Sequence, residues 1–289
     1  MCDEFTAGAE DAALASQGVT RRTFAALGGA ATLAACAGPS NGQTAALTES
    51  TVRIPTPDGS ADAFFVHPFK GAHPGIVLWP DVGGLRDAMM IMGRRLAGSG
   101  YAVLVPNQYY RGAAAPVITS FSEWRRPEGQ AKLRPLIAAL NGEGTIRDAT
   151  AFVGFLDGHA AVDKGRKIGT QGYCMGGPFA VRTAAAVPGR VGAAASFHGG
   201  GLASDKPDSP HLLLSRTQAS YLIAVAENDD AKDPAEKERF RDAAAAAGRH
   251  AEIEVYPADH GWCVPDTPMY NHVQADRAWG RLLAIYAKL

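Results

Sequence analysis

Gly172-Tyr173-Cys174-Met175-Gly176-Gly177 follows the stretch 167–171 and precedes an apolar segment with helix-forming residues. This order predicts a strand, a sharp turn at Cys174 and then a helix. Glycine is needed on both sides because a nucleophile on such a turn has a strained backbone, and a Cβ two residues away would collide with the neighbouring strand or helix. Gly-x-Cys-x-Gly is the pattern of a nucleophile elbow with sulfur in place of oxygen. We therefore predict a reactive thiol, and the alternative is a buried cysteine that packs as a small hydrophobe.

An acid and a histidine follow the cysteine in the order that an elbow nucleophile requires. The apolar run Tyr221–Ala226 is typical of a buried parallel strand and leads to Asp229. A second predicted strand, 250–257, leads to His260. Each candidate lies just beyond the carboxyl end of a predicted strand, where open α/β sheets place their sites. The sequence predicts a catalytic set of Cys174, Asp229 and His260.

Other residues near these positions compete for the same roles. Asp230 is the obvious rival for the acid, and Asp233 is a poorer one because it precedes a proline and is typical of a helix N-cap. His198 follows a predicted strand, and we interpret it as a packing or loop histidine because His260 has the expected order and turn. Cys263 is expected to have an apolar role.

Together with Trp79-Pro80-Asp81-Val82-Gly83-Gly84-Leu85-Arg86 after an early strand, these motifs resemble the dienelactone hydrolase family of α/β-hydrolases. The resemblance covers roughly residue 50 to the C-terminus, and the cysteine elbow is its most specific part, because most α/β-hydrolases carry serine there. It implies an α/β fold in which a mostly parallel central sheet is flanked by helices on both faces. It also implies a small-molecule lactone or ester as substrate, and no cofactor.

The resemblance assigns further roles around the elbow. It implies that the N–H groups of Val82 and Met175 form an oxyanion hole. Asp81 stands where the family usually has a glutamate that contacts the resting thiol, although an aspartate in a Pro-Asp-x-Gly turn is equally a good turn residue. Arg111 and Trp262 complete the expected set of thiol-contacting or substrate-binding residues, although a single arginine is more often a solvated surface charge.

The expected mechanism is hydrolysis through a Cys-His-Asp triad and a thioester acyl-enzyme. Well-known dienelactone hydrolases bind the substrate carboxylate with an arginine four residues past the histidine, where this chain has Val264. A neutral lactone or small ester therefore fits at least as well as dienelactone. The alternatives are a non-catalytic envelope binding protein on a hydrolase fold, and another acyl-transfer enzyme such as a peptidase or acyltransferase.

Composition supports a globular enzyme and excludes several other classes. The 289 residues are 46% hydrophobic and 20% charged, which suits one large α/β domain. A formal net charge of −1 gives no basic surface for nucleic acid. The four cysteines have no metal-ligand spacing, so we predict no metal site. The oligomeric state is left open.

The N-terminal residues are expected to lie outside the fold. Twin arginines in Thr20–Phe24 precede a weakly apolar stretch, so residues 1–36 resemble a twin-arginine export signal, and Cys36 ends a lipobox-like sequence. This predicts export to the periplasm or cell envelope, with a membrane tether if Cys36 is lipidated. The alternative is a cytoplasmic enzyme with a disordered leader. Residues 37–50 are expected to be a flexible tether, and 51–289 the hydrolase domain.

The remaining pattern predicts the elements around the site. Residues 106–130 are expected to be a long irregular stretch over the substrate. Thr145 resembles a capping box that starts a helix ending at Leu156. The other predicted elements are a hairpin of strands 51–54 and 61–66, strands 75–79 and 101–105, and helices 87–97 and 273–288.

Overall fold

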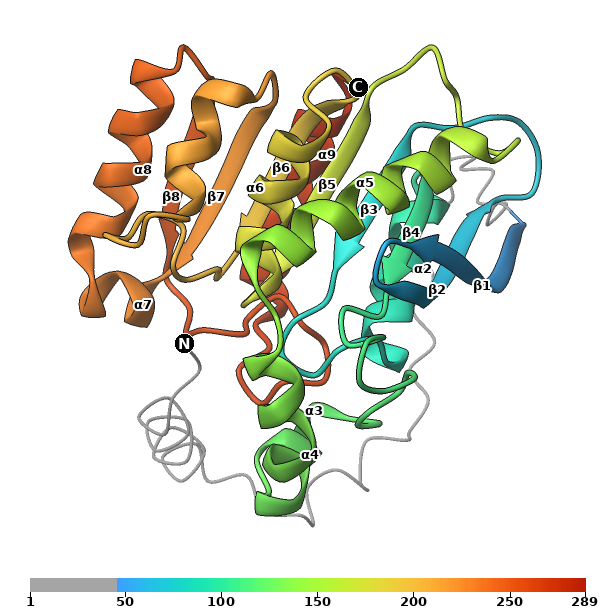
Figure 1. Cartoon of the computed structure of the whole chain (residues 1–289). Helices are drawn as coiled ribbons and strands as arrows, with labels where there is room; N and C mark the ends of the chain where they lie inside the picture. The colour runs from blue at the N-terminus through green and yellow to red at the C-terminus, as the bar shows by residue number, and fades with distance from the viewer. Residues whose placement is uncertain (1–45) are drawn as a thin grey trace, which may run out of the picture. The chain divides into compact units, whose positions relative to one another are not determined.

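The computed structural model describes residues 46–289, which contain an eight-stranded sheet in the order β1-β2-β4-β3-β5-β6-β7-β8 (Figure 1). β1 pairs antiparallel with β2 and β2 antiparallel with β4, whereas the remaining neighbours are parallel. This confirms the predicted mostly parallel sheet. The strands are β1 (Leu47–Thr56), β2 (Gly59–Pro68), β3 (Gly75–Trp79), β4 (Ala102–Pro106), β5 (Ile168–Tyr173), β6 (Val191–Phe197), β7 (Ser220–Ala226) and β8 (Ala251–Tyr256).

Helices cover both faces of the sheet, as predicted. Two of them, α2 (Asp87–Gly98) and α9 (His272–Tyr286), bury Met89, Leu96 and Leu282 in one core. The opposite face carries α5 (Gly142–Gly158), α6 (Gly176–Ala186) and α8 (Pro234–Ala246). In Figure 1, α5 and α6 lie in front of the sheet and α9 behind it. None of the helices within 46–289 has the length and apolar character that crossing a bilayer would need.

The first strand begins earlier than the sequence analysis predicts. β1 starts at Leu47, and residues 47–50 pair with Pro68 to Phe65 of β2. The predicted tether, 37–50, therefore overlaps the sheet, which includes residues 47–50 as well as those from Thr51 on. Little in the sequence marks this extension, because Leu47 and Thr48 are only partly buried and the two residues after them are exposed, so they show little of the apolar alternation that marks a strand. The predicted export signal and Cys36 lie outside the described residues.

Helix α5 also starts earlier than predicted, because a different residue caps it. The side chain of Asn141 accepts a hydrogen bond from the N–H of Gly144 at 2.8 Å, which makes Asn141 the N-cap. Thr145 is already inside the first turn, where its hydroxyl donates to the Asn141 carbonyl at 2.9 Å. The predicted capping box at Thr145 was wrong.

The stretch 106–130 is less irregular than expected. It contains the short helix α3 (Phe121–Trp124) and the start of α4 (Pro127–Ala138). Both lie at the lower end of Figure 1, beside the chain that follows β8. At the end of β7 stands α7 (Glu227–Lys232), and a 3-10 helix, η2 (Pro210–Arg216), packs against α6 and α8.

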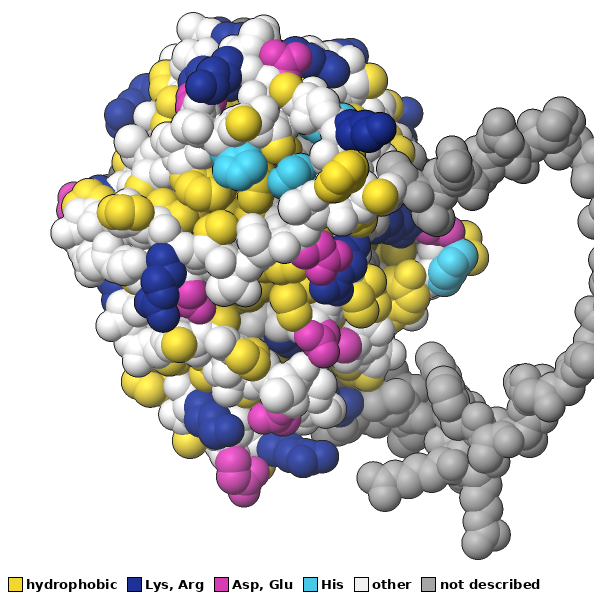
Figure 2. All heavy atoms as spheres, turned by 90° about the vertical axis from the view of Figure 1, so that its right-hand side faces the viewer, with side chains coloured by type: hydrophobic (Ala, Val, Ile, Leu, Met, Phe, Trp, Pro, Cys, Tyr) yellow, Lys and Arg dark blue, Asp and Glu magenta, His cyan; other side chains and the backbone are white. Residues whose placement is uncertain are grey.

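The face at the β1–β2 side shows no field of a single charge sign. Figure 2 shows basic and acidic side chains scattered there among hydrophobic ones. This distribution fits the formal net charge of −1 and gives that face no basic footprint for a polyanion.

Candidate active site

The nucleophile elbow has the backbone that its glycines predict. Cys174 has φ of +52°, in the left-handed region, between the end of β5 and the start of α6. A Cβ on Gly172 would lie 1.9 Å from the carbonyl oxygen of Gly176, and a Cβ on Gly176 would lie 2.5 Å from that of Pro80. The predicted collisions are confirmed: the turn closes only because both residues lack a side chain.

The backbone of Cys174 is held from the neighbouring strand. Its N–H donates to the carbonyl of Phe197 and to Nδ1 of His198, each at 3.1 Å. Cys174 itself is 5% exposed. The strained turn is therefore fixed by β6 as well as by its own strand and helix.

His198 was interpreted as a packing or loop histidine, but it contacts the elbow, because its Nδ1 accepts the N–H of Cys174. The residue is buried, and its φ of +42° places it in the left-handed region. Its ring contacts His260 and Trp262 edge to face, with centroids 4.8 and 5.1 Å apart. Burial, and then the neighbouring charge of His260, hold the pKa of His198 well below its usual range.

Asp229 and His260 meet at the carboxyl ends of β7 and β8. The Oδ2 atom of Asp229 lies 2.6 Å from Nδ1 of His260. The backbone of His260 is fixed too, because its N–H donates to the Asn228 side chain at 2.9 Å. Asp229 stands in the short helix α7 rather than in the predicted turn.

The rival carboxylates are engaged elsewhere. Asp230 pairs with Lys237 at 2.5 Å, and Asp233 pairs with Arg239 at 2.5 Å. Asp233 is the N-cap residue of α8, as predicted, although its side chain makes no capping hydrogen bond. The histidine partner among these three acids is therefore Asp229.

The two residues expected to supply oxyanion donors follow neighbouring strands. Trp79 at the end of β3 pairs with Gly172 in β5, so the loop containing Val82 and the elbow containing Met175 leave the same edge of the sheet. The hydroxyl of Tyr109 donates to the Val82 carbonyl at 2.8 Å and lies 3.9 Å from the sulfur of Met175. A tyrosine just after β4 thus connects the two segments.

Tyr109 and its neighbour Gln108 were not among the site residues predicted from the sequence. Gln108 donates to the Asp81 carbonyl at 2.7 Å, next to the bond that Tyr109 makes. The only available signal was position, since both residues directly follow the buried strand β4 at the active edge of the sheet.

Asp81 makes the contacts of a buried turn residue. Arg86 donates to its two carboxylate oxygens at 2.7 and 2.9 Å, and the Gly83 N–H donates to Oδ1 at 2.8 Å. Arg86 also binds both oxygens of Asp266, at 2.7 and 2.8 Å. Burial opposes the charge of Arg86, but the attraction of Asp81 and the hydrogen bonds to both carboxylates raise its pKa. The loop that carries Val82 is thereby tied to the segment that follows His260.

Arg111 and Trp262 are both engaged in structural contacts. Arg111 forms ion pairs with Asp58 at 2.6 Å and with Asp148 at 2.8 Å. Trp262 is fully buried and stacks on Tyr256, with centroids 5.2 Å apart. Val264 is fully buried as well, so no cation stands where a substrate carboxylate is bound in well-known dienelactone hydrolases.

Cys263 packs as the sequence analysis expects. It lies in the core between the sheet and the helices α2 and α9, and burial raises the pKa of its thiol well above the usual range. Within 46–289, neither Cys174 nor Cys263 forms a disulfide. The same residues contain no group of three or more His, Cys, Asp or Glu that could hold a metal ion.

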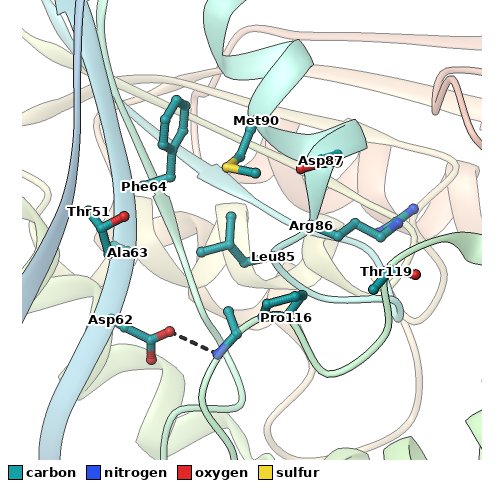
Figure 3. Close-up of a pocket in the computed structure, with 11 residues that line it drawn as sticks. Thr51, Asp62, Ala63, Phe64, Leu85, Arg86, Asp87, Met90, Pro116 and Thr119 are labelled. Atoms are coloured by element: carbon teal, nitrogen blue, oxygen red, sulfur yellow. Dashed lines mark hydrogen bonds between the residues drawn. The ribbon is translucent and has the colours of Figure 1, made fainter.

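A cavity of about 260 Å³ lies beside Leu85 and Arg86 of the loop that carries Val82, on the side of β2 and α2. Figure 3 shows Phe64, Leu85 and Met90 around it, with the hydrogen bond from the Ala115 N–H to Asp62 at its edge. Neither the elbow nor the Asp229–His260 pair lines this cavity.

The sheet order, the elbow and the acid-histidine pair define an α/β-hydrolase fold. The model of the dienelactone hydrolase family matches residues 61–289, so the chain belongs to this family and is a hydrolase.

Relatives agree with this assignment. A Methylorubrum extorquens protein provisionally named carboxymethylenebutenolidase is 27% identical over 275 residues, which cover 91% of each chain. The crystal structure of a provisionally named dienelactone hydrolase from Klebsiella pneumoniae superposes with a TM-score of 0.72 at 23% identity, covering 84% of this chain and all of the other. A dienelactone hydrolase-like promiscuous phosphotriesterase from metagenomic libraries gives a TM-score of 0.69 at 21% identity, with coverages of 84% and 99%.

Proposed function

We propose that this hydrolase cleaves a lactone or small carboxylic ester through Cys174, His260 and Asp229, with a thioester intermediate. The observation that carries the proposal is the 2.6 Å contact of His260 Nδ1 with Asp229, in a chain whose Cys174 stands on a left-handed elbow turn. Because Nδ1 is engaged by the carboxylate, Nε2 is the nitrogen that exchanges protons with the thiol and the leaving group.

The reaction has two stages. In the first, His260 takes the proton of Cys174, and the thiolate attacks the ester carbonyl while the Val82 and Met175 N–H groups stabilise the oxyanion. The protonated His260 then gives its proton to the departing alkoxide, which leaves a thioester on Cys174. In the second, His260 activates a water that attacks the thioester, and the carboxylic acid and the thiol are released.

A neutral substrate suits the surroundings of the site. Val264 is buried and apolar, and Arg86 is already bound by two carboxylates. Arg111, which was expected to bind substrate, is paired with Asp58 and Asp148. These three positions are thus apolar or already neutralised, which favours esters and lactones without a negative charge.

The test is hydrolysis of a short-chain p-nitrophenyl ester, a neutral lactone and a dienelactone by the full chain. Wild type is compared with Cys174→Ala, and Cys263→Ala is the matched control for loss of a buried thiol. We expect Cys174→Ala to lose activity by several orders of magnitude and Cys263→Ala to retain it. An acyl adduct on Cys174, detected by mass spectrometry and released by hydroxylamine, identifies the thioester. Equal inertness of wild type and Cys174→Ala on all three substrates would instead favour a binding protein.

Export remains a separate proposal, supported by the twin arginines and the lipobox-like sequence alone. It predicts a mature protein that begins at Cys36, in the envelope fraction, with a lipid on that cysteine. An intact N-terminus in the cytoplasmic fraction would contradict it.

A further inference from the structure

We propose that His198 is a positioning residue of the hydrolytic reaction, whose neutral imidazole holds the nucleophile's backbone through Nδ1 and the base through its ring. The inference rests on the proposed function, because it assigns His198 a role toward the same Cys174 and His260. It goes beyond that function by adding a residue that takes no part in the proton transfers.

The first observation is a single ring that contacts both reacting residues. His198 Nδ1 accepts the Cys174 N–H at 3.1 Å, and the same ring lies edge to face against His260 with centroids 4.8 Å apart. Trp262 packs on another side of the ring at 5.1 Å, edge to face. A displacement of His198 would therefore change the positions of nucleophile and base relative to each other.

The second observation is the backbone. His198 and Cys174 are the two non-glycine residues with positive φ in the described chain, at +42° and +52°. A strained conformation persists only where its surroundings fix it. The His198 N–H donates to the Ala224 carbonyl of β7 at 2.8 Å, so the residue is itself anchored before it binds the elbow.

These contacts also require a particular protonation state of His198. A neutral imidazole accepts at one nitrogen and donates at the other, so the proton of His198 is on Nε2 while Nδ1 accepts from Cys174. A cationic His198 would lose that hydrogen bond. It would also repel His260 when His260 carries the nucleophile's proton. The other titratable ring near it is Tyr173 of β5, with centroids 6.0 Å apart, whose pKa burial raises well above its usual range.

Two substitutions separate the two contacts. His198→Asn keeps an acceptor near the position of Nδ1 and tolerates a positive φ, but loses the ring. His198→Phe keeps a ring against His260 and loses the acceptor. Tyr221→Phe is the control, because it removes one buried hydrogen bond, to Thr217 at 2.8 Å, in the same sheet without touching Cys174 or His260.

Two readouts are used: kcat and KM on a p-nitrophenyl ester, and the pH dependence of Cys174 alkylation by iodoacetamide, followed by mass spectrometry. We expect His198→Phe to lower kcat about 10- to 100-fold with little change in KM, as expected for misplaced reacting groups. We also expect it to shift the alkylation profile. His198→Asn should recover part of kcat, and Tyr221→Phe should change melting temperature alone.

The outcomes separate this inference from the proposed function. If wild type hydrolyses the ester but both His198 variants keep its kcat and its alkylation profile, the positioning role is wrong while the proposed function stands. If wild type is inert on esters but the alkylation profile shifts in His198→Phe, the contact stands and the proposed function fails. If His198→Phe does not fold, His198→Gln replaces it. The glutamine side chain is one carbon longer than that of asparagine, so its amide oxygen lies too far along to accept the Cys174 N–H. Equal kcat in the Asn and Gln variants would then overturn the inference.

Discussion

Arg86 places its guanidinium against both carboxylate oxygens of Asp81, and the side chains of this pair are 0% and 2% exposed. The pair lies in the loop that carries Val82, and its two residues are five positions apart in the sequence. A second carboxylate, Asp266, closes the arrangement from the segment after His260. The charges in the loop that carries Val82 are therefore compensated from two distant parts of the chain.

Arg86→Met is expected to destabilise the fold by about 3–5 kcal/mol, because it leaves the buried charge of Asp81 without a partner. The matched control is Arg94→Met, whose ion pair with Glu49 has side chains 39% and 36% exposed. That change should cost less than about 1 kcal/mol. Urea unfolding of the two variants measures the difference. An equal decrease in the free energy of unfolding would show that burial of the Arg86–Asp81 pair does not increase its contribution to stability.

Asp229→Asn is expected to lower kcat on a p-nitrophenyl ester by about 10²- to 10⁴-fold, because His260 loses its orienting carboxylate. Asp230→Asn is the control, since Asp230 pairs with Lys237 in the same helix region. It should leave kcat nearly unchanged. A larger loss in Asp230→Asn than in Asp229→Asn would exchange the roles of the two acids.

Gly176→Ala is expected to destabilise the protein by more than about 3 kcal/mol, because the added Cβ would lie 2.5 Å from the Pro80 carbonyl oxygen. Gly154→Ala in helix α5 is the control, with nothing within 4 Å of the added Cβ. Alanine has the higher helix propensity, so this variant should gain about 0.5–1 kcal/mol. Thermal melts test both, and a stable, active Gly176→Ala enzyme would contradict the close approach.

His198 also gives stability a defined pH dependence. Its pKa is held well below the usual value of about 6.5 in the folded state, so below that pH the unfolded chain binds the extra proton and folding stability falls. The contribution is at most about 1.4 kcal/mol per pH unit and is absent above about pH 6.5. His198→Asn should therefore flatten the decline between about pH 6.5 and 5.

The measurement is urea unfolding of wild type and His198→Asn at several pH values in this window. His159 and His211, whose pKa values burial also lowers, contribute with the same sign in both proteins. Parallel stability profiles of the two proteins would mean that His198 does not titrate as described.

Much of the fold was predictable because the central strands are buried on both faces. Strand β3 is buried throughout and was predicted at its observed bounds, 75–79. Strand β7 starts one residue before the predicted run Tyr221–Ala226. The acid-histidine pair followed from a different rule, since Asp229 and His260 come shortly after the carboxyl ends of β7 and β8.

The parts that sequence reasoning missed depend on partners far apart in the chain or on local competition. Asp266 lies 180 residues from Arg86, and no local pattern joins them. His198 was considered from the sequence, but its contact with the elbow was not predicted. Its hydrogen bond to Cys174 depends on how β5 and β6 pair. The start of α5 was misplaced because Asn141 competes with Thr145 as a cap, and both types are common N-caps.

The bond between Arg86 and Asp266 also bears on when the enzyme gains its activity during synthesis. A chain leaves the ribosome from its N-terminus, so Asp81, Arg86 and the elbow emerge well before Asp266 and His260. Until the C-terminal segment docks, the loop that carries Val82 lacks the carboxylate of Asp266, and Cys174 lacks the histidine proposed as its base. On the proposed mechanism, an incomplete nascent chain has Cys174 without His260, so hydrolysis requires that the C-terminal segment has emerged and docked.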